Sequence, residues 1–354
     1  MFQTGSQTVI VGMSGGVDSS VSAYLLKEAG YRVIGLFMKN WEEADERGQC
    51  KASREYEDVI KVCQEIDIPH YTVNFIEEYQ KSVFSQFLAD MEAGLTPNPD
   101  ILCNREIKFK VFLQKAKELG ADFLATGHYC RTDGLGRLLK GSDPDKDQSY
   151  FLHAVEKGAL RSVLFPVGHL RKPEVRAIAR KIGLATSEKK DSTGICFIGK
   201  RDFKSFVSGY IAYTPGNLET PSGQVVGRHD GTAFYTIGQR KGIGLGGEGE
   251  PWYVVGKDMA RNVVLVERGD HHPLLNRLSL EAKNLTWIEE PPPTLPYCCK
   301  AKIRYRQVDQ DCIIQKILDD TATITFDVPQ RAVTPGQSIV FYQDDLCLGG
   351  GVII

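Results

Sequence analysis

A glycine-rich stretch near the N-terminus has the residues of a phosphate-binding loop. It lies between a short β-branched run, Thr8–Val11, and a helical pattern, Ser19–Ala29. Adjacent glycines let backbone N–H groups converge, and the start of a helix adds partial positive charge. The loop lacks the Gly-Lys-Ser/Thr ending of P-loop NTPases and the G-x-G-x-x-G fingerprint of dinucleotide-binding proteins. A plain turn capped by Asp18 or Ser19 is the alternative. The stretch reads Met13-Ser14-Gly15-Gly16-Val17-Asp18-Ser19-Ser20.

Two of the nine cysteines stand out by their surroundings. Cys103 lies in the polar stretch 98–104, which we interpret as a loop between two helices. Cys196 follows Lys189 and Lys190, and nearby cations favour the nucleophilic thiolate form of a thiol. The alternative for each is a buried structural cysteine. The sequence contains no C-x-x-C pair and no Cys/His ligand run, so it does not predict a zinc ribbon.

A doubly wound α/β domain is predicted to position these groups, because strand and helix patterns alternate along the first half of the chain. Ligands of such sheets bind beyond the carboxyl ends of the strands, where the glycine-rich loop lies. The predicted strands are Thr8–Val11, Tyr31–Met38, His70–Asn74 and Phe123–Thr126. The predicted helices are Ser19–Ala29, Ser53–Ile66, Glu77–Ala93, Ile107–Leu119 and Glu174–Ile182.

The pattern changes after about Lys204, where Gly, Pro and Thr become frequent. Short alternating runs there indicate small β modules. The predicted strands are Ala233–Ile237, Trp252–Val255, Asn262–Val266, Cys299–Arg306, Ile313–Ile317, Ala322–Phe326 and Ser338–Tyr342.

The charge is unevenly distributed along the 354 residues, whose net charge is −2. Twelve Lys and Arg stand against four Asp and Glu from Lys157 to Lys204, a segment that contains Cys196. Such asymmetry favours an anionic partner on one face. In the predicted strand Cys299–Arg306, period two would place four cations on one face, either as a phosphate-binding stripe or as a solvated outer face. These cations are Lys300, Lys302, Arg304 and Arg306.

The hydrophobic content of 42% is enough for a sizeable core, and the length favours two or three domains. The sequence has no run of about 18 apolar residues, so no transmembrane helix is predicted. The N-terminus lacks the pattern of a signal peptide. We therefore expect a cytoplasmic protein without a membrane partner.

Six strings in this order carry a resemblance to a known family: GMSGGVDSS, NPDILCN, TGHY, KDQSYFL, DSTGICFIG and YTIGQRKG. The first resembles the PP-loop of ATP pyrophosphatases, which split ATP between the α and β phosphates and leave AMP on a substrate oxygen. Together the strings resemble the tRNA-specific 2-thiouridylase family over nearly the whole chain. The resemblance implies a PP-loop ATP-binding catalytic domain (adenine nucleotide alpha hydrolase-like) over residues 1–204, a β-rich central domain over 205–277 and a tRNA-binding C-terminal β-barrel over 278–354.

The resemblance implies ATP-dependent 2-thiolation of the wobble uridine in glutamate, glutamine and lysine tRNAs. Adenylation would turn the uracil C2 oxygen, a poor leaving group, into AMP, and sulfur would then attack the same carbon. By the same resemblance Cys196 carries the persulfide and Cys103 completes sulfur release, leaving a Cys103–Cys196 disulfide that a reductant reopens. Asp100 is a candidate acid/base or base-reading group. A turn-forming Asp after Pro99 is the alternative.

The resemblance also assigns binding residues, Mg²⁺ alongside ATP without a named protein ligand, and a persulfide sulfur donor, either a cysteine desulfurase or a relay protein. The uridine must leave its stack for the enzyme to reach carbon 2. The residues implied for ATP are Gly12, Met13, Ser14, Gly15, Gly16, Val17, Asp18, Ser19, Met38 and Gly127. The residues implied for the tRNA anticodon loop and target base are Asn98, Pro99, Asp100, His128, Lys146, Asp147, Gln148, Arg304, Tyr305 and Gln337.

Three other hypotheses stay open. An amide-forming PP-loop synthetase would need a glutaminase or amino-acid site, and no N-terminal cysteine nucleophile supports one. The intact loop 14–19 speaks against a non-catalytic tRNA-binding module. Cys103, Cys196 and a third ligand such as Asp100 would be the ligands of an iron–sulfur cluster. Apart from this hypothesis, no tightly bound metal is predicted.

Overall fold

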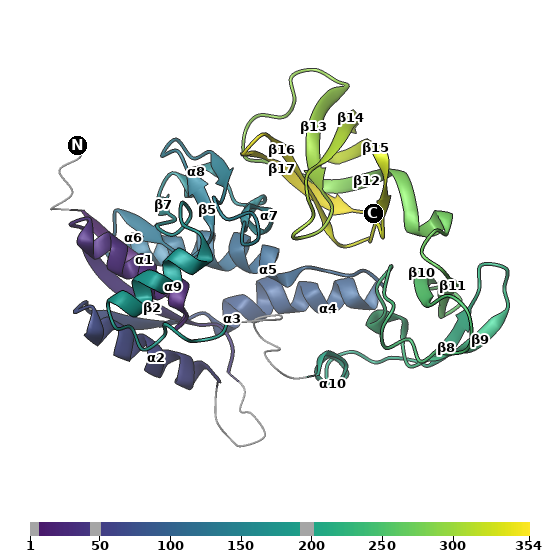
Figure 1. Ribbon diagram of the computed structural model, residues 1–354, viewed down its shortest axis with the longest axis horizontal. Helices are drawn as coiled ribbons and strands as arrows, with labels where there is room; N and C mark the ends of the chain where they lie inside the picture. The colour runs from purple at the N-terminus through teal and green to yellow at the C-terminus, as the bar shows by residue number, and fades with distance from the viewer. Residues whose placement is uncertain (1–6, 43–50, 192–201) are drawn as a thin grey trace.

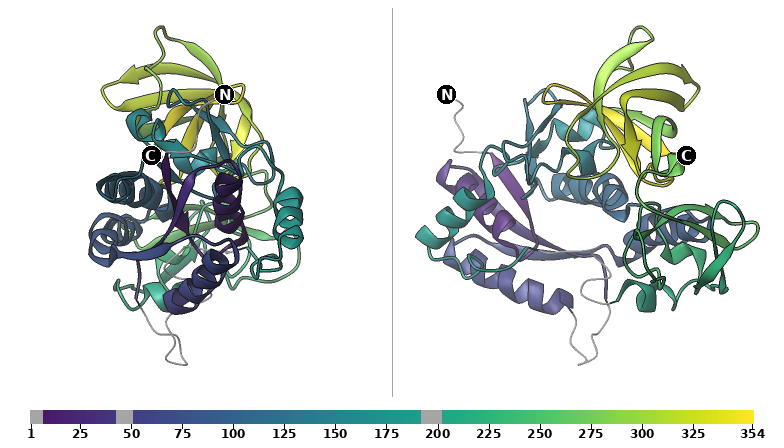
Figure 2. Two further views of the ribbon diagram at one scale, coloured as in Figure 1. Left: turned by 90° about the vertical axis from the view of Figure 1, so that its left-hand side faces the viewer. Right: turned by 45° about the vertical axis from the view of Figure 1, so that its right-hand side comes forward.

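The computed structural model describes residues 7–42, 51–191 and 202–354. The chain forms an α/β body that carries the N-terminus, a β-barrel that carries the C-terminus and a smaller β-rich body (Figure 1). The right-hand view of Figure 2 shows the barrel and the smaller body on the side of the sheet away from α1 and α2. This architecture confirms the predicted fold class. No helix in the described ranges is both long and apolar enough to cross a membrane.

A five-stranded parallel sheet is the centre of the α/β body. Its order is β3-β2-β1-β4-β7, so the chain runs outward from β1 to β3 and then returns to the other side of β1. The loops after β1 and β4 therefore meet where the strand order reverses, which is where such sheets bind ligands. The strands are β1 (Thr8–Met13), β2 (Arg32–Lys39), β3 (His70–Asn74), β4 (Phe123–Ala125) and β7 (Val163–Leu164).

Helices cover both faces of this sheet, because alternate side chains of β1 point to opposite sides. Val9 and Val11 pack with α1 (Val17–Glu28), α2 (Lys51–Glu65) and α9 (Lys172–Lys181). Ile10 packs on the other face, against two longer helical segments. The first comprises α3 (Ile76–Tyr79), the π-helical η1 (Gln80–Phe84) and α4 (Ser85–Glu92). The second comprises α5 (Pro99–Leu102), the π-helical η2 (Cys103–Phe112) and α6 (Leu113–Glu118).

The interpretation of residues 98–104 as a loop was wrong, because the second helical segment begins at Pro99 rather than Ile107. The Asn98 side chain accepts a hydrogen bond of 3.2 Å from the Asp100 backbone N–H and so caps the helix. Proline at the first helical position needs no N–H partner. Cys103 is therefore held in a helix, at the first residue of a π-helical stretch, a feature frequent at functional sites.

Six antiparallel strands close into a barrel, because β12 pairs with both β15 and β17. The barrel is joined to the α/β body through the hairpin of β5 (Cys130–Thr132) and β6 (Leu138–Lys140), which pairs with β17. Val340, Tyr342 and Cys347 share a core cluster with the α/β helices. The barrel strands are β12 (Asn276–Trp287), β13 (Tyr297–Lys302), β14 (Gln310–Leu318), β15 (Thr321–Arg331), β16 (Ser338–Gln343) and β17 (Leu346–Ile353).

The smaller body is a four-stranded sheet of order β10-β11-β8-β9. The predicted strand Ala233–Ile237 was wrong, since a short 3₁₀ helix, Thr232–Phe234, forms here and no strand is assigned over the residues that follow it up to Ile237, although Tyr235 is extended. The ammonium of Lys257 donates 2.9 Å to the carbonyl of Gly94, just after α4. The strands are β8 (Gly216–Glu219), β9 (Val225–His229), β10 (Trp252–Asp258) and β11 (Val263–Arg268). The remaining helices are α7 (Ser149–Leu152), α8 (Lys157–Leu160), α10 (Phe203–Val207) and the 3₁₀ helix η4 (Pro273–Leu275).

The predicted stripe of four cations does not form on one strand face. Strand β13 ends at Lys302, and Arg304 and Arg306 lie in the turn that follows, where Arg306 has a φ of +64°. The side chain of Lys302 is only 12% exposed and its ammonium lies 3.3 Å from the Asp147 carboxylate. The turn breaks the two-residue period, so Arg304 and Arg306 are exposed beyond the strand while Lys302 is turned toward Asp147.

Candidate active site

The glycine-rich loop connects β1 to α1 and is closed by its own serines. The Ser19 hydroxyl accepts from the Ser14 backbone N–H at 3.2 Å and lies 3.2 Å from the Ser14 hydroxyl. The Ser20 hydroxyl donates to the Gly16 carbonyl at 2.9 Å. At Gly15, φ is +68° and an added Cβ would lie 2.6 Å from the Glu55 carbonyl, so only glycine fits. The loop is thus fixed at the start of α1, where backbone N–H groups favour an anion.

A second loop, Gly127-His128-Tyr129, follows β4 and contacts the first one. A Cβ added to Gly127 would lie 2.7 Å from the backbone N of Ser19. The Tyr129 hydroxyl donates 2.7 Å to Oδ1 of Asp18. Between them, the His128 ring lies 5.7 Å from the ring of Phe109 on η2. This segment therefore joins the glycine-rich loop to the helix that carries Cys103.

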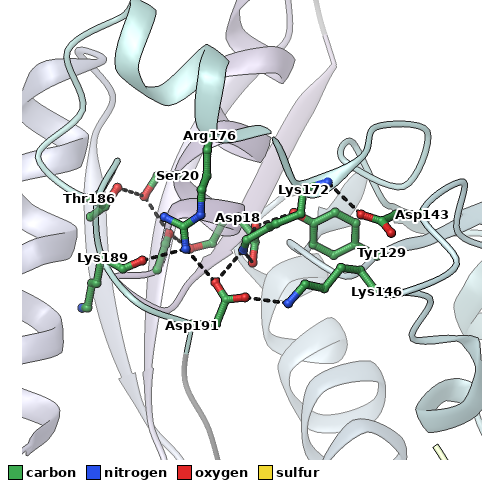
Figure 3. A network of polar contacts seen from close by, with 12 residues as sticks. Asp18, Ser20, Tyr129, Asp143, Lys146, Lys172, Arg176, Thr186, Lys189 and Asp191 are labelled. Carbon is green, nitrogen blue, oxygen red and sulfur yellow. Dashed lines mark hydrogen bonds and ion pairs between the residues drawn. The ribbon is translucent and has the colours of Figure 1, made fainter. Parts of the chain in front are cut away.

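Asp18 is held by a buried cation that is distant in the sequence but adjacent in the fold. The Lys172 ammonium, on a side chain 10% exposed, donates 2.7 and 2.8 Å to the two carboxylate oxygens of Asp18 (Figure 3). The backbone N–H of Lys172 donates 2.8 Å to Asp143, which fixes the first turn of α9. Sequence reasoning did not single out Lys172 or Tyr129, because the contacts of Asp18 with them span 154 and 111 residues.

Asp191 extends the same network (Figure 3). Its carboxylate receives ion pairs from Lys146 at 2.7 Å, Lys172 at 2.8 Å and Arg176 at 3.0 Å. Burial alone would raise the pKa of Asp191, but the hydrogen bonds and charges of Lys146 and Lys172 outweigh it and lower the pKa to about 2. Asp191 is therefore a carboxylate at neutral pH, and it was not among the residues singled out from the sequence.

The helix that begins at Pro99 holds the Cys103 side of the site. Cys103 is 3% exposed. Lys108, one turn further along η2, donates 3.0 Å to the side-chain oxygen of Asn104. The Asn104 amide in turn donates 3.2 Å to the carbonyl of Phe151. Cys103 thus lies in a helix rather than in a loop, packed in the hydrophobic core and adjacent to the hydrogen-bonded Asn104.

Lys108 also acts on two groups that the sequence singled out. Burial raises the pKa of Asp100, and the positive charge of Lys108 opposes that rise. Burial holds the pKa of His128 well below its usual value, and Lys108 lowers it further. The Thr126 hydroxyl lies 2.8 Å from Nδ1 of His128 and orients its ring. The structure thus brings Asp100 and His128 around one cation at the Cys103 helix.

Comparison with known proteins then decides the family. A family model described as tRNA methyl transferase HUP domain matches residues 7–200, one described as tRNA methyl transferase PRC-barrel domain matches 204–268, and one described as Aminomethyltransferase beta-barrel domain matches 277–353. The tRNA-specific 2-thiouridylase MnmA of Protochlamydia amoebophila (strain UWE25) is 62% identical over 98% of this chain and 93% of its own length. The MnmA of Geobacillus thermodenitrificans (strain NG80-2) is 55% identical over 98% and 94%. The chain belongs to the tRNA-specific 2-thiouridylase MnmA family.

This finding confirms the family and the enzyme class that the motifs implied. The descriptions of the family models refer to methyl transfer, whereas the near-full-length relatives are named for thiolation. Because these relatives are more than 50% identical to this chain, we assign the family from them. Among solved structures, the U34-tRNA thiolase NcsA from Methanococcus maripaludis with its [4Fe-4S] cluster is 22% identical, covers 57% of this chain and 64% of its own, and has a TM-score of 0.34.

Three of the residues that the MnmA resemblance implies for tRNA, Asp147, Tyr305 and Gln337, make contacts between the barrel and the α/β body. Asp147 is buried, and its carboxylate accepts bonds from the Gly141 backbone, Ser149 and Lys302. The Gln148 side chain accepts from the Tyr129 backbone N–H at 3.0 Å. Both residues therefore have structural contacts in the free protein.

Two barrel residues approach the Cys103 helix. The Gln337 amide donates 2.6 Å to the carbonyl of Thr96, just before the Asn98 cap. The ring of Tyr305 lies 4.4 Å from the ring of Phe151, whose carbonyl accepts from Asn104. The barrel thus contacts the segment before the Cys103 helix directly and is linked to the helix itself through Phe151. A shallow cavity of about 380 Å³ lies over the turn that follows β13 and is lined by Arg304, Tyr305, Arg306, Gln307, Val308, Gln310, Pro329, Gln330 and Arg331.

Met38 lies in β2, near its carboxyl end, and is partly buried against the core that contains Cys103. Cys196 lies outside the described residues, so its distance from Cys103 is not part of this geometry. Within residues 7–42, 51–191 and 202–354, no group of three His, Cys, Asp or Glu side chains could hold a metal ion. The iron–sulfur hypothesis depends partly on Cys196, which is not in those ranges.

Proposed function

We propose that this MnmA family member forms 2-thiouridine at the wobble position of glutamate, glutamine and lysine tRNAs in an ATP-dependent reaction. The observation that carries this proposal is the loop Gly127-His128-Tyr129. Its first and third residues contact the glycine-rich loop, and its middle residue packs on the Cys103 helix. A nucleotide at one loop and a uracil at the other would therefore be neighbours, as adenylation of the base requires.

In the first step, the uracil C2 oxygen attacks the α phosphorus of ATP and pyrophosphate leaves. The loop 12–19 and the start of α1 would hold the phosphates, with Met38 and Gly127 beside the nucleotide. Mg²⁺, held mainly by phosphate oxygens and water, would neutralise the developing charge. Asp18 is the carboxylate of this loop, and both of its oxygens already accept bonds from Lys172.

In the second step, the terminal sulfur of a Cys196 persulfide attacks carbon 2, and AMP leaves with the former carbonyl oxygen. The Cys103 thiolate then attacks the Cys196 sulfur, which releases the thiocarbonyl and leaves a Cys103–Cys196 disulfide. A dithiol reductant reopens the disulfide, and a persulfide donor, a desulfurase or relay protein, reloads Cys196. Asp100, whose pKa is raised by burial, would exchange a proton with these groups.

The tRNA would lie across the α/β body and the barrel. Asn98, Pro99, Asp100 and His128 would surround the flipped uridine. In the same proposal the remaining contacts to the tRNA come from Lys146, Asp147, Gln148, Arg304, Tyr305 and Gln337. This proposal assigns catalysis to residues 1–204 and tRNA binding to residues 278–354, with a β-rich central domain over 205–277 between them.

The test incubates the full chain with ATP, Mg²⁺, a persulfide donor and unmodified glutamate tRNA, followed by mass spectrometry of the wobble nucleoside. Cys196→Ser and Cys103→Ser should each abolish thiouridine while tRNA binding and tRNA-dependent pyrophosphate release persist. Cys298→Ser, at an exposed barrel cysteine, is the matched control and should leave the reaction unchanged. Full activity of either active-site variant would contradict the proposed roles.

A further inference from the structure

Three cations converge on one carboxylate next to the glycine-rich loop. Lys146, Lys172 and Arg176 contact Asp191 at 2.7, 2.8 and 3.0 Å. Figure 3 shows that they approach from different parts of the chain. Arg176 and Lys172 belong to α9, whereas Lys146 belongs to the segment before α7. A carboxylate that collects three cations occupies the kind of site that a phosphate group would take, because both anions accept from the same Lys and Arg donors.

The cations are held in place independently of Asp191. The Arg176 guanidinium also donates 2.8 Å to the Ser187 carbonyl and 3.0 Å to the Lys189 carbonyl. The Lys172 ammonium also donates to both oxygens of Asp18. Removal of the Asp191 carboxylate would therefore leave both cations where they are, with unused donor capacity beside the start of α1.

The loop and the Asp191 segment are joined at a second point. The Lys189 ammonium donates 2.8 Å to the carbonyl of Gly15 and 2.6 Å to Asp58. Thr186 donates 3.3 Å to the Ser20 hydroxyl. The segment 186–191 thus lies against the loop that binds phosphate in our proposed function, and the side chain of Asp191 in this segment is 34% exposed.

We propose that Lys172 and Arg176 bind the β and γ phosphates of ATP, or the pyrophosphate released from it, and that Asp191 is an internal competitor that must be displaced when this polyphosphate binds. The proposal rests on the proposed function, because it requires ATP at loop 12–19. A nucleotide polyphosphate suits these cations better than an RNA phosphate, because Lys172 is mostly buried and contacts Asp18 of that loop. Lys146, the third partner of Asp191, holds the competitor in place.

The decisive variant removes the competitor. Asp191→Asn frees donors on Lys172 and Arg176, and we expect the affinity for inorganic pyrophosphate to rise by about three- to tenfold, the range given by one or two partly exposed ion pairs. A residue that merely supports the fold would give unchanged or weaker binding. The matched control is Glu188→Gln, which removes a carboxylate from the same segment but one paired with Arg180 instead of the loop cations, and should leave the affinity unchanged.

A second pair of variants tests the cations themselves. Arg176→Gln should weaken pyrophosphate binding at least fivefold, by the loss of a charge-assisted contact. Arg180→Gln, one turn further along α9 and 57% exposed, should not. The measurement is calorimetric titration of the full chain with magnesium pyrophosphate and, separately, with ATP, after thermal melting has established that each variant is folded.

The outcomes separate this proposal from the proposed function. If the unaltered protein binds ATP but Asp191→Asn fails to tighten pyrophosphate, the competitor proposal is overturned and the ATP site stands. If Asp191→Asn tightens unmodified tRNA and not pyrophosphate, the cations serve RNA and the proposal is again overturned. If the unaltered protein binds no ATP, both proposals fail. The proposal is established if Asp191→Asn, unlike Glu188→Gln, binds pyrophosphate more tightly and Arg176→Gln binds it more weakly.

Discussion

The hydroxyl of Tyr129 donates a 2.7 Å hydrogen bond to Oδ1 of Asp18 and links the loops that follow β4 and β1. Tyr129 is 2% exposed, and burial together with the negative charge of Asp18 raises the pKa of its hydroxyl, which therefore stays a donor. Tyr129→Phe should lower the free energy of unfolding by about 1.5–3 kcal/mol, the range for a hydrogen bond to a charged group. ATP affinity should fall several-fold, because Asp18 then depends on Lys172 alone.

Urea unfolding and ATP titration measure these two effects. Tyr297→Phe is the matched control, since it removes a hydroxyl that bonds Gln343 in the barrel at 2.9 Å. It should leave ATP affinity unchanged. Equal ATP affinities for Tyr129→Phe and the unaltered protein would show that this bond does not position the loop.

Gly127 is required by close packing against the start of α1. A Cβ there would lie 2.7 Å from the Ser19 backbone N and 2.8 Å from the Asp18 backbone C, both of which are fixed by the helix. Gly127→Ala should therefore lower the free energy of unfolding by about 1–3 kcal/mol and reduce ATP affinity. Gly158→Ala, where nothing lies within 4 Å, should keep or slightly raise stability. Similar stabilities for the two variants would contradict the packing argument.

The sequence predicted the parts of the site that depend on neighbouring residues. The run Thr8–Val11 and the stretch after it predicted β1 and the glycine-rich loop between β1 and α1, because β-branched residues and adjacent glycines act locally. The pairing of Asp18 with Lys172 could not be predicted, because it depends on how α9 packs against α1, 154 residues away.

The start of the helix that contains Cys103 had a local signal in the sequence, whereas the end of β13 did not. The Asn98-Pro99 pair is an N-cap followed by a first-turn proline, and it predicts the helix that contains Cys103. The alternation from Lys300 to Arg306 is typical of a strand, but it could not show that β13 ends at Lys302, since strand ends depend on partners.

Arg304 and Lys302 should differ in their effects on tRNA binding. Arg304 is exposed in the turn beside the cavity, whereas Lys302 is paired with Asp147. Arg304→Ala should weaken tRNA binding and reduce the slope of log K against log salt by about one. Lys302→Ala should instead lower protein stability, because Asp147 is left buried with fewer donors. Filter binding across a salt series distinguishes the two variants. Equal salt slopes would mean that Lys302 and Arg304 both contact tRNA phosphates, as the predicted stripe of cations required.

Lys108 should set the pH dependence of the reaction. Its charge lowers the pKa of Asp100 and of His128, so Lys108→Gln should raise both. If Asp100 acts as the base, it is active when ionised, and a higher pKa moves the acidic limb of the rate profile to higher pH. The variant should therefore lose more activity at pH 6 than at pH 8. Single-turnover thiolation across this range is the measurement.

Lys110→Gln is the control for Lys108, since Lys110 lies on the same helix but is exposed and paired with Glu106 at 2.8 Å. Its acidic limb should coincide with that of the unaltered enzyme. A limb that moves to lower pH in Lys108→Gln would assign the profile to a group other than Asp100.

Lys257 should make the stability of the protein rise with pH in the alkaline range. Burial lowers its pKa to about 8, against 10.5 for an exposed lysine. The unfolded chain therefore binds more protons than the folded one between these values, and stability rises with pH across that window. Relative to Lys257→Met, which cannot titrate, the unaltered protein should gain about 2–3 kcal/mol in free energy of unfolding from pH 8 to 10.5. Urea unfolding of both proteins at each pH measures this difference. A difference that stays flat would mean that Lys257 is solvated, and that its bond to Gly94 does not hold the smaller body against α4.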